Sequence, residues 1–261
     1  MKTISQIEIP SLVSSWANPN AIARLFCFPY AGGGPHIYRN WPQMLPHAVE
    51  FFAVQLPGQG ARLRERPYTD IANAVEDLLG PLERYLDKPI SLFGHSLGAL
   101  ICFELALRLR DKHGIEPGLL IVSGRGAPQI PSNAAPTYNL PDRELINELQ
   151  RLNGTPREVL DHPELMELML PKIRADFQIS ETYNFVKKPP LNCPITVMGG
   201  ADDQEVPRDS LEAWNEHTKG RFTLHVLPGD HFMIHSAEAA VVNLVNHDLR
   251  LMTGNSGNMP E

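Results

Sequence analysis

The feature that most constrains this chain is the G-x-S-x-G pattern at residues 94–98, which places Ser96 between two apolar runs. The run before it, 89–93, has the short apolar character of a buried strand, and the run after it, 99–103, begins a helical pattern. A strand that turns into a helix at this pattern is typical of a nucleophile elbow. The glycines allow a turn tight enough to hold a serine in strained geometry with its hydroxyl exposed. A non-catalytic Gly/Ser turn would have the same sequence pattern. Residues elsewhere in the chain must therefore distinguish it from a nucleophile elbow.

Short apolar runs alternate with longer amphipathic segments over most of the chain. Near-continuous apolar runs indicate strands covered on both faces, and they occur at 24–29, 51–56, 90–93, 119–123, 195–199 and 223–227. Helices are predicted at about 70–87, 97–113, 207–218 and 236–252. The alternation predicts an α/β fold with a doubly wound, mostly parallel central sheet flanked by helices.

The segment 127–190 interrupts this alternation, because it contains no strand pattern. Helix starts are predicted in it at Pro141, Pro156 and Pro163, and Pro171 is expected to interrupt the last helix before it resumes over 172–186. The predicted organisation is a core over 1–126 and 191–252, a helical lid insertion over 127–190, and a flexible tail over 253–261. A packed helical subdomain is the alternative to a lid that covers the carboxyl edge of the sheet.

Charge and cysteine content restrict the partners and the compartment. The formal net charge of −7 argues against general affinity for nucleic acid or anionic membranes. A local basic cluster at Arg62, Arg64 and Arg66 is equally well explained as a solvated loop. Three scattered cysteines indicate reduced thiols. With no apolar signal region and no membrane-length segment, we expect a cytoplasmic protein.

Residues that could activate a serine follow two later strands. A serine nucleophile needs a base, and the base needs a third group to orient it. Asp202, Asp203 and Glu205 follow the strand at 195–199; the spacing to the neighbouring glycines and Val-Pro favours Asp203, then Asp202, then Glu205. His231 follows the last strand in a Gly/Asp turn and is the predicted base.

The other histidines offer rivals for this role. His231 and His235 are four apart, as in helical zinc pairs, but no glutamate follows His231 and no third ligand is evident, so no metal site is predicted. His95 is expected to pack locally inside the elbow, and His36 follows a glycine loop from which it could approach the site. The remaining histidines are expected at the surface or at helix ends: His47, His113, His162, His217, His225 and His247.

A glycine-rich turn at 28–34 follows the first strong strand. In hydrolases with an elbow, a loop at this place gives one backbone N–H to an oxyanion hole, and the residue after the nucleophile gives another. These positions are Ala31 and Leu97. A phosphate-binding loop is the competing interpretation, but the Walker lysine and the G-x-G-x-x-G spacing are absent from the sequence.

Several runs resemble the type II (external, editing) thioesterases of polyketide and nonribosomal peptide assembly lines, within the α/β-hydrolase superfamily. The resemblance covers almost the whole chain, and it rests on the runs 28–33, 55–62, 94–98, 171–177 with Tyr183, 200–203 with Trp214, and 229–232. The run 171–177 is the most family-specific, since a generic hydrolase would share the triad but not this lid sequence. The chain departs from the family at Gln59, where arginine is usual, and at Leu97, where many members have methionine.

The resemblance implies an acyl group carried as a thioester on the phosphopantetheine arm of an acyl- or peptidyl-carrier domain. It implies cleavage through an acyl-enzyme on Ser96, with His231 as base and Asp203 as acid partner, without a metal or organic cofactor, in a protein expected to be a monomer. Candidate substrate contacts are Tyr30, Met166, Leu168, Met169 and Phe177, although methionines in such runs more often fill a core.

Two other functions stay open at this point. A carboxylesterase or lipase would use the same triad on free esters. A non-catalytic binding protein would keep the hydrolase fold with a silent triad.

Overall fold

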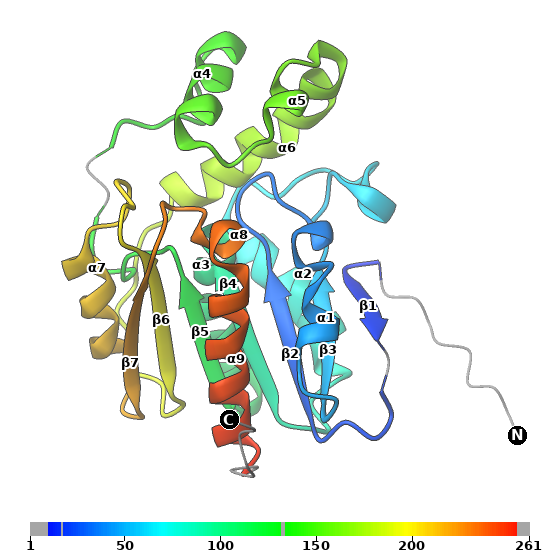
Figure 1. The fold of residues 1–261 in the computed structure, drawn as a ribbon, viewed down its shortest axis with the longest axis vertical. Helices are drawn as coiled ribbons and strands as arrows, with labels where there is room; N and C mark the ends of the chain where they lie inside the picture. Colours follow the sequence, from blue (N-terminus) through cyan, green and yellow to red (C-terminus); the bar gives the residue numbers. More distant parts are fainter. Residues whose placement is uncertain (1–9, 17, 132–133, 255–261) are drawn as a thin grey trace, which may run out of the picture.

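A computed structural model describes residues 10–16, 18–131 and 134–254. Its centre is a seven-stranded sheet in the order β1-β3-β2-β4-β5-β6-β7, in which β1 runs antiparallel to β3 and the other neighbours are parallel (Figure 1). The strands are β1 (Leu12–Trp16), β2 (Ala23–Phe28), β3 (Val49–Val54), β4 (Ile90–His95), β5 (Leu119–Ser123), β6 (Ile195–Gly200) and β7 (Phe222–Leu227). The predicted α/β fold with a mostly parallel sheet is confirmed, and so are all six predicted strands.

Helices cover both faces of the sheet, which explains why most residues of its central strands are apolar and buried. On one face lie η1 (Pro35–Tyr38), α1 (Trp41–Met44), α8 (Met233–Ser236) and α9 (Glu238–Met252). On the other lie α2 (Ile71–Glu83), α3 (Leu97–His113), α7 (Arg208–Glu212) and η3 (Ala213–His217). The short η2 (Gly60–Arg62) lies in the loop after β3.

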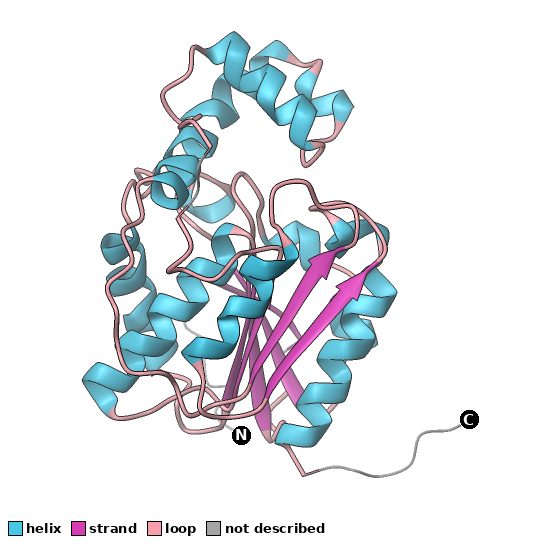
Figure 2. Ribbon diagram, turned by 90° about the vertical axis from the view of Figure 1, so that its left-hand side faces the viewer, coloured by secondary structure: helices cyan, strands magenta, loops and turns pink. Residues whose placement is uncertain are grey.

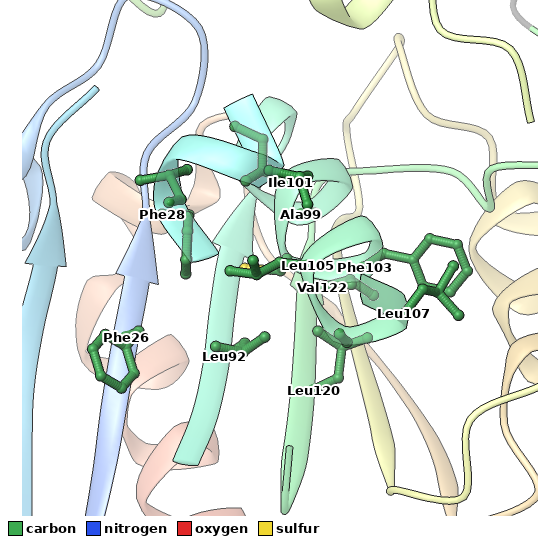
Figure 3. Close-up of a cluster of buried hydrophobic side chains, with 14 of the residues drawn as sticks. Phe26, Phe28, Leu92, Ala99, Ile101, Phe103, Leu105, Leu107, Leu120 and Val122 are labelled. Atoms are coloured by element: carbon green, nitrogen blue, oxygen red, sulfur yellow. The ribbon is translucent and has the colours of Figure 1, made fainter. Parts of the chain in front are cut away.

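The central helix α3 is apolar around most of its circumference because it is buried between the sheet and its neighbours. Figure 3 shows its side chains meeting those of β2, β4 and β5, for example Leu105 above Leu92 and Val122. The helix ends at Gly114, whose φ of +67° provides the left-handed cap that glycine favours. Both predicted ends of this helix are confirmed, and the elbow therefore leads directly into a helix that is buried along most of its length.

The segment between β5 and β6 carries α4 (Asp142–Leu152), α5 (Arg157–Leu160) and α6 (Pro163–Glu181), with no strand among its described residues. Figures 1 and 2 show these helices above the carboxyl edge of the sheet. They have a small apolar core of their own, made of Leu145, Leu149, Met166, Leu170 and Ile173. We call residues 127–190 the cap.

The structure corrects the prediction for Pro171. The helix α6 continues through this residue and ends at Glu181, whereas an interruption and an end at 186 were predicted. A proline inside a helix removes one hydrogen bond at a cost of about 3 kcal/mol. Burial of Leu170 and Ile173 on either side of it in the cap core offsets that cost.

Other local predictions also need amendment. The strand β1 was not predicted; it forms an antiparallel edge through backbone pairing with β3. His217, predicted at the surface or at a helix end, is the last residue of η3. It is buried among the rings of Phe103, Trp214 and Phe185, and its Nε2 lies 2.5 Å from Gln129 Oε1. Of the predicted flexible tail, 255–261 lie outside the described residues. None of the helices in the described ranges is long and apolar enough to cross a bilayer.

Candidate active site

Ser96 is the single residue between β4 and α3, and its backbone has the strained geometry that the elbow requires. Its φ is +52° and its ψ is −112°; only Asn153 among the other described non-glycine residues has a positive φ. Strain of this kind costs about 1–3 kcal/mol and persists only where the surroundings enforce it. A Cβ on Gly94 would lie 2.2 Å from the carbonyl oxygen of Gly98, and one on Gly98 would lie 2.1 Å from that of Phe28. Backbone therefore packs directly on backbone around the serine.

His231 and Asp203 form a hydrogen-bonded pair at the same edge of the sheet. They follow the neighbouring parallel strands β7 and β6, and His231 Nδ1 lies 2.8 Å from Asp203 Oδ2. The side chain of Asp203 is only 1% exposed. Its Oδ1 accepts the N–H groups of Glu205 at 2.8 Å and Val206 at 3.2 Å. An ionised carboxylate can only accept, so the proton lies on Nδ1 of His231 and leaves Nε2 free to take another.

The other two carboxylates of this loop have different surroundings. Asp202 is exposed. Glu205 pairs with Arg151 of the cap helix α4, with Nη1 and Oε1 2.7 Å apart. The structure thus joins Asp203, the first of the predicted acids, to His231, and it leaves Asp202 and Glu205 at the surface.

His95 lies next to the ring of His231. It is fully buried, its Nδ1 is 2.9 Å from Ser123 Oγ, and its ring centroid is 5.3 Å from that of His231. Burial, reinforced by the neighbouring His231 and His235, lowers the pKa of His95 well below its ordinary value. The side chain packs locally, as predicted, and adds no charge beside His231.

The glycine-rich loop follows β2, whose Phe28 is paired with Gly94 at the start of the elbow. Residues 30–33 form a turn in which the N–H of Gly33 donates to the carbonyl of Tyr30 at 2.9 Å. Gly32 has φ of +77°, as at the third position of a type II turn. Within the described ranges, neither the Ala31 N–H nor the Leu97 N–H finds a hydrogen-bond acceptor. Both N–H groups thus have no protein acceptor among the described residues, and their role as oxyanion-hole donors stays a prediction.

The remaining predicted contacts pack mainly against protein. The Tyr30 hydroxyl is hydrogen-bonded to Nε2 of His235, with the two atoms 2.8 Å apart. Burial raises the pKa of Tyr30 to about 12. His231 and His235 thus bond to different partners, and the described part of the chain contains no cluster of metal-binding side chains. Met166 is buried in the cap core, Met169 and Phe177 pack against it, and Leu168 is exposed. Contact between these residues and a substrate stays a prediction.

Sequence reasoning missed the polar contact that joins the cap to the glycine-rich loop. Asp176 of α6 accepts the N–H of Gly32 in the glycine-rich loop, with N and Oδ2 2.8 Å apart. The contact joins residues 144 positions apart, so no local pattern could reveal it. The only signal was that Asp176 lies within the family-specific run 171–177.

Comparisons with known proteins agree with this geometry. The thioesterase-domain family model matches residues 23–249. The chain is 42% identical over 247 residues to the gramicidin S biosynthesis protein GrsT of Aneurinibacillus migulanus, covering 93% of this chain and 96% of that protein.

Solved structures give the same result. The type II thioesterase BorB from the borrelidin biosynthetic cluster is 37% identical with a TM-score of 0.85, over 92% of this chain and 97% of that one. The RedJ thioesterase from the prodiginine pathway in Streptomyces coelicolor is 34% identical with a TM-score of 0.84, over 93% and 96%. The chain therefore belongs to the thioesterase family of serine hydrolases, and within it to the type II thioesterases of nonribosomal peptide and polyketide biosynthesis.

Proposed function

We propose that this protein hydrolyses acyl thioesters on the phosphopantetheine arm of carrier domains, using Ser96, His231 and Asp203 as a catalytic triad. The observation that carries the assignment is the buried Asp203–His231 hydrogen bond at the edge where the strained Ser96 stands. A carboxylate that is nearly inaccessible to water and bonded to a loop imidazole orients that imidazole and stabilises its protonated form.

In the first step, Nε2 of His231 takes the proton of Ser96 while Oγ attacks the thioester carbonyl carbon. The carbonyl oxygen becomes an oxyanion, which the N–H groups of Ala31 and Leu97 stabilise. Loss of one such donor typically raises the barrier by about 3 kcal/mol. Collapse of the intermediate breaks the C–S bond, and the proton on His231 passes to the departing pantetheine sulfur.

The leaving group makes this chemistry easier than alkyl ester cleavage. A thiol has a pKa of about 8.5, against about 15.7 for water, so its anion departs with less help from an acid. In the second step, His231 takes a proton from water, and the resulting hydroxide attacks the acyl-enzyme. Ser96 recovers its proton, and the free carboxylic acid leaves.

We assign the cap the role of a lid through which the carrier arm reaches Ser96. The assignment is supported by the position of the cap above the carboxyl edge of the sheet (Figures 1 and 2). It is also supported by contacts of the cap with the glycine-rich loop and with the loop that carries His231. α6 contacts the glycine-rich loop through Asp176, and at the end of α4 a Cβ on Gly154 would lie 2.0 Å from Cζ of Phe232, next to His231.

A competition experiment tests the substrate class. An acyl-carrier thioester and a p-nitrophenyl ester of the same acid are offered together to the wild-type protein and to Ser96→Ala. We expect the carrier thioester to be consumed far faster by the wild type and neither to be consumed by the variant. Preference for the free ester would indicate a carboxylesterase, and failure of a fluorophosphonate to label Ser96 would indicate a non-catalytic binding protein.

A further inference from the structure

The contact between Asp176 and the glycine-rich loop lies beside the proposed oxyanion hole. Asp176 is 2% exposed, and its carboxylate accepts the N–H of Gly32, the residue after Ala31. Ile173, one turn earlier on α6, packs on the same place, because a Cβ on Gly32 would lie 3.1 Å from its Cγ1. Two successive turns of the cap helix therefore rest on one glycine of the loop.

The charge of Asp176 is neutralised within the helix. Lys172, four residues earlier and 5% exposed, forms an ion pair with the same Oδ2 that accepts the Gly32 N–H. Lys172 also packs on the loop after β3, since a Cβ on Gly58 would lie 3.3 Å from its Cβ. A lone carboxylate at this place would repel the oxyanion that develops during catalysis. With Lys172 as its partner, Asp176 still accepts the Gly32 N–H, and the pair of side chains carries no net negative charge.

The glycines of this loop do not by themselves fix its conformation, so a contact from outside the loop is needed to do so. In the turn at 30–33, the middle peptide joins Ala31 to Gly32, and its rotation interconverts type I and type II turns. Glycine adopts both signs of φ with little steric cost, and Gly33 and Gly34 follow directly. The Gly32 N–H points to Asp176 in the type II form that the structure shows. This bond therefore favours one conformation of a loop that its own residues leave nearly free.

We propose that Asp176 is a positioning residue, which keeps the Ala31 N–H in place for the oxyanion, and that Lys172 serves it as a neutralising partner. The hole is then preorganised only while α6 rests on the loop, so that the position of the cap controls the reactivity of Ser96. The inference rests on the proposed Ser96 chemistry and adds a residue that touches neither substrate nor nucleophile.

A matched pair of double variants isolates the hydrogen bond from the charges. Lys172→Met with Asp176→Asn and Lys172→Met with Asp176→Leu both remove the ion pair, and asparagine and leucine are similar in size. Only the asparagine variant keeps an oxygen that can accept the Gly32 N–H. Arg174→Gln is the control: it breaks bonds from α6 to the carbonyls of Tyr138 and Leu140 inside the cap and leaves the loop contact intact.

The first readout is the rate at which a fluorophosphonate labels Ser96, together with kcat and KM on an acyl-carrier thioester. We expect the leucine variant to label and turn over at least about tenfold more slowly than the asparagine variant, because misplacing a catalytic group by about 1 Å costs up to about 100-fold. KM should differ by less than about threefold, since the bond acts on the transition state and not on substrate binding. Equal rates in the two double variants, or an equal loss in Arg174→Gln, would overturn the proposal.

The second readout does not depend on catalysis. Amide hydrogen exchange in the peptide that contains 28–34 should be faster in the leucine variant than in the asparagine variant, and unchanged in Arg174→Gln. A wild-type protein that fails to label would refute the proposed function, while this exchange comparison would still decide whether Asp176 holds the loop. Equal exchange rates in the asparagine and leucine variants would refute the proposal that Asp176 holds the glycine-rich loop, whatever the catalytic activity of the two variants.

Discussion

Replacement of Asp203 by asparagine should abolish most of the activity while leaving the fold nearly intact. The side chain is 1% exposed, and its two oxygens have separate tasks. Oδ1 accepts two loop N–H groups, which an amide oxygen can also accept, and Oδ2 accepts the proton on His231 Nδ1. In Asp203→Asn an N–H₂ group faces Nδ1 in place of that oxygen. His231 then carries its proton on Nε2 and cannot take one from Ser96.

The expected loss follows from this change of tautomer. In Ser-His-Asp hydrolases the equivalent exchange lowers kcat by about 10⁴, which is about 5.4 kcal/mol of activation free energy. Stability should change far less, because the asparagine N–H₂ donates a hydrogen bond to the unprotonated Nδ1 and only the charge of the partner is lost. A hydrogen bond to a charged group contributes about 1.5–3 kcal/mol, against about 1 kcal/mol for a neutral one. Asp203→Ala should lower the melting temperature further, since the bonds to the loop N–H groups are lost as well.

Release of free thiol from an acyl N-acetylcysteamine thioester gives a direct assay with a thiol-reactive dye. Background from the protein should be low, because all three cysteines are buried and unpaired. Burial raises the pKa of Cys27 and Cys102 well above the usual value, and burial raises that of Cys193 to about 12. Asp202→Asn is the matched control, since this exposed neighbour is not bonded to His231 and its replacement should leave kcat unchanged.

The reasoning would be refuted by an Asp203→Asn protein that keeps more than about a tenth of the wild-type kcat. It would also be refuted if Asp202→Asn lost as much activity as Asp203→Asn. Either result would mean that the buried hydrogen bond does not fix the tautomer of the base.

Three further predictions concern stability and its dependence on pH. Gly98→Ala should destabilise the fold by about 3 kcal/mol or prevent folding, because its Cβ would overlap the Phe28 carbonyl; a melting curve like that of the wild type would contradict this. His95 has a lowered pKa when folded, so the unfolded chain binds the extra proton, and the free energy of unfolding should fall by up to about 1.4 kcal/mol per pH unit below about pH 6.5. Denaturant titrations from pH 7.5 to 5.5 should show a shallower fall in His95→Asn, and an unchanged slope would count against a neutral His95. Arg151→Ala should cost less than about 1 kcal/mol by thermal melting, because its pair with Glu205 is largely exposed; a larger loss would mean that this link holds the cap in place.

Sequence reasoning succeeded where a local pattern and a buried position indicate the same structure. The strand before Ser96, the helix after it and the glycines between them are specified within a short window, and the structure reproduces both ends of α3. The proximity of Asp203 and His231 could be predicted from the sequence for a related reason. Parallel strands bring their carboxyl ends to one edge, so residues just after β6 and β7 are neighbours by topology alone.

The errors occurred where distant residues decide the local structure. Pro171 should break a helix by its own chemistry, but burial of its neighbours in the cap core keeps α6 continuous. His217 ends η3, which is one of the two predicted alternatives, but Phe103 and Phe185, which come from elsewhere in the chain, help to bury it. The bond from Asp176 to Gly32 depends on how the cap lies on the core, and such packing of one segment on another leaves no periodic trace in the sequence.

The central claim is that Ser96 carries the acyl group between the carrier thiol and water. Mass spectrometry of the intact protein and of its digested peptides tests this claim most directly. The samples are quenched within the first turnover after mixing with an acyl-loaded carrier domain. The account predicts a mass increase equal to the acyl group, located on the peptide that contains Ser96 and absent from Ser96→Ala. Turnover with an unmodified Ser96 peptide, or near-normal turnover by Ser96→Ala, would contradict it.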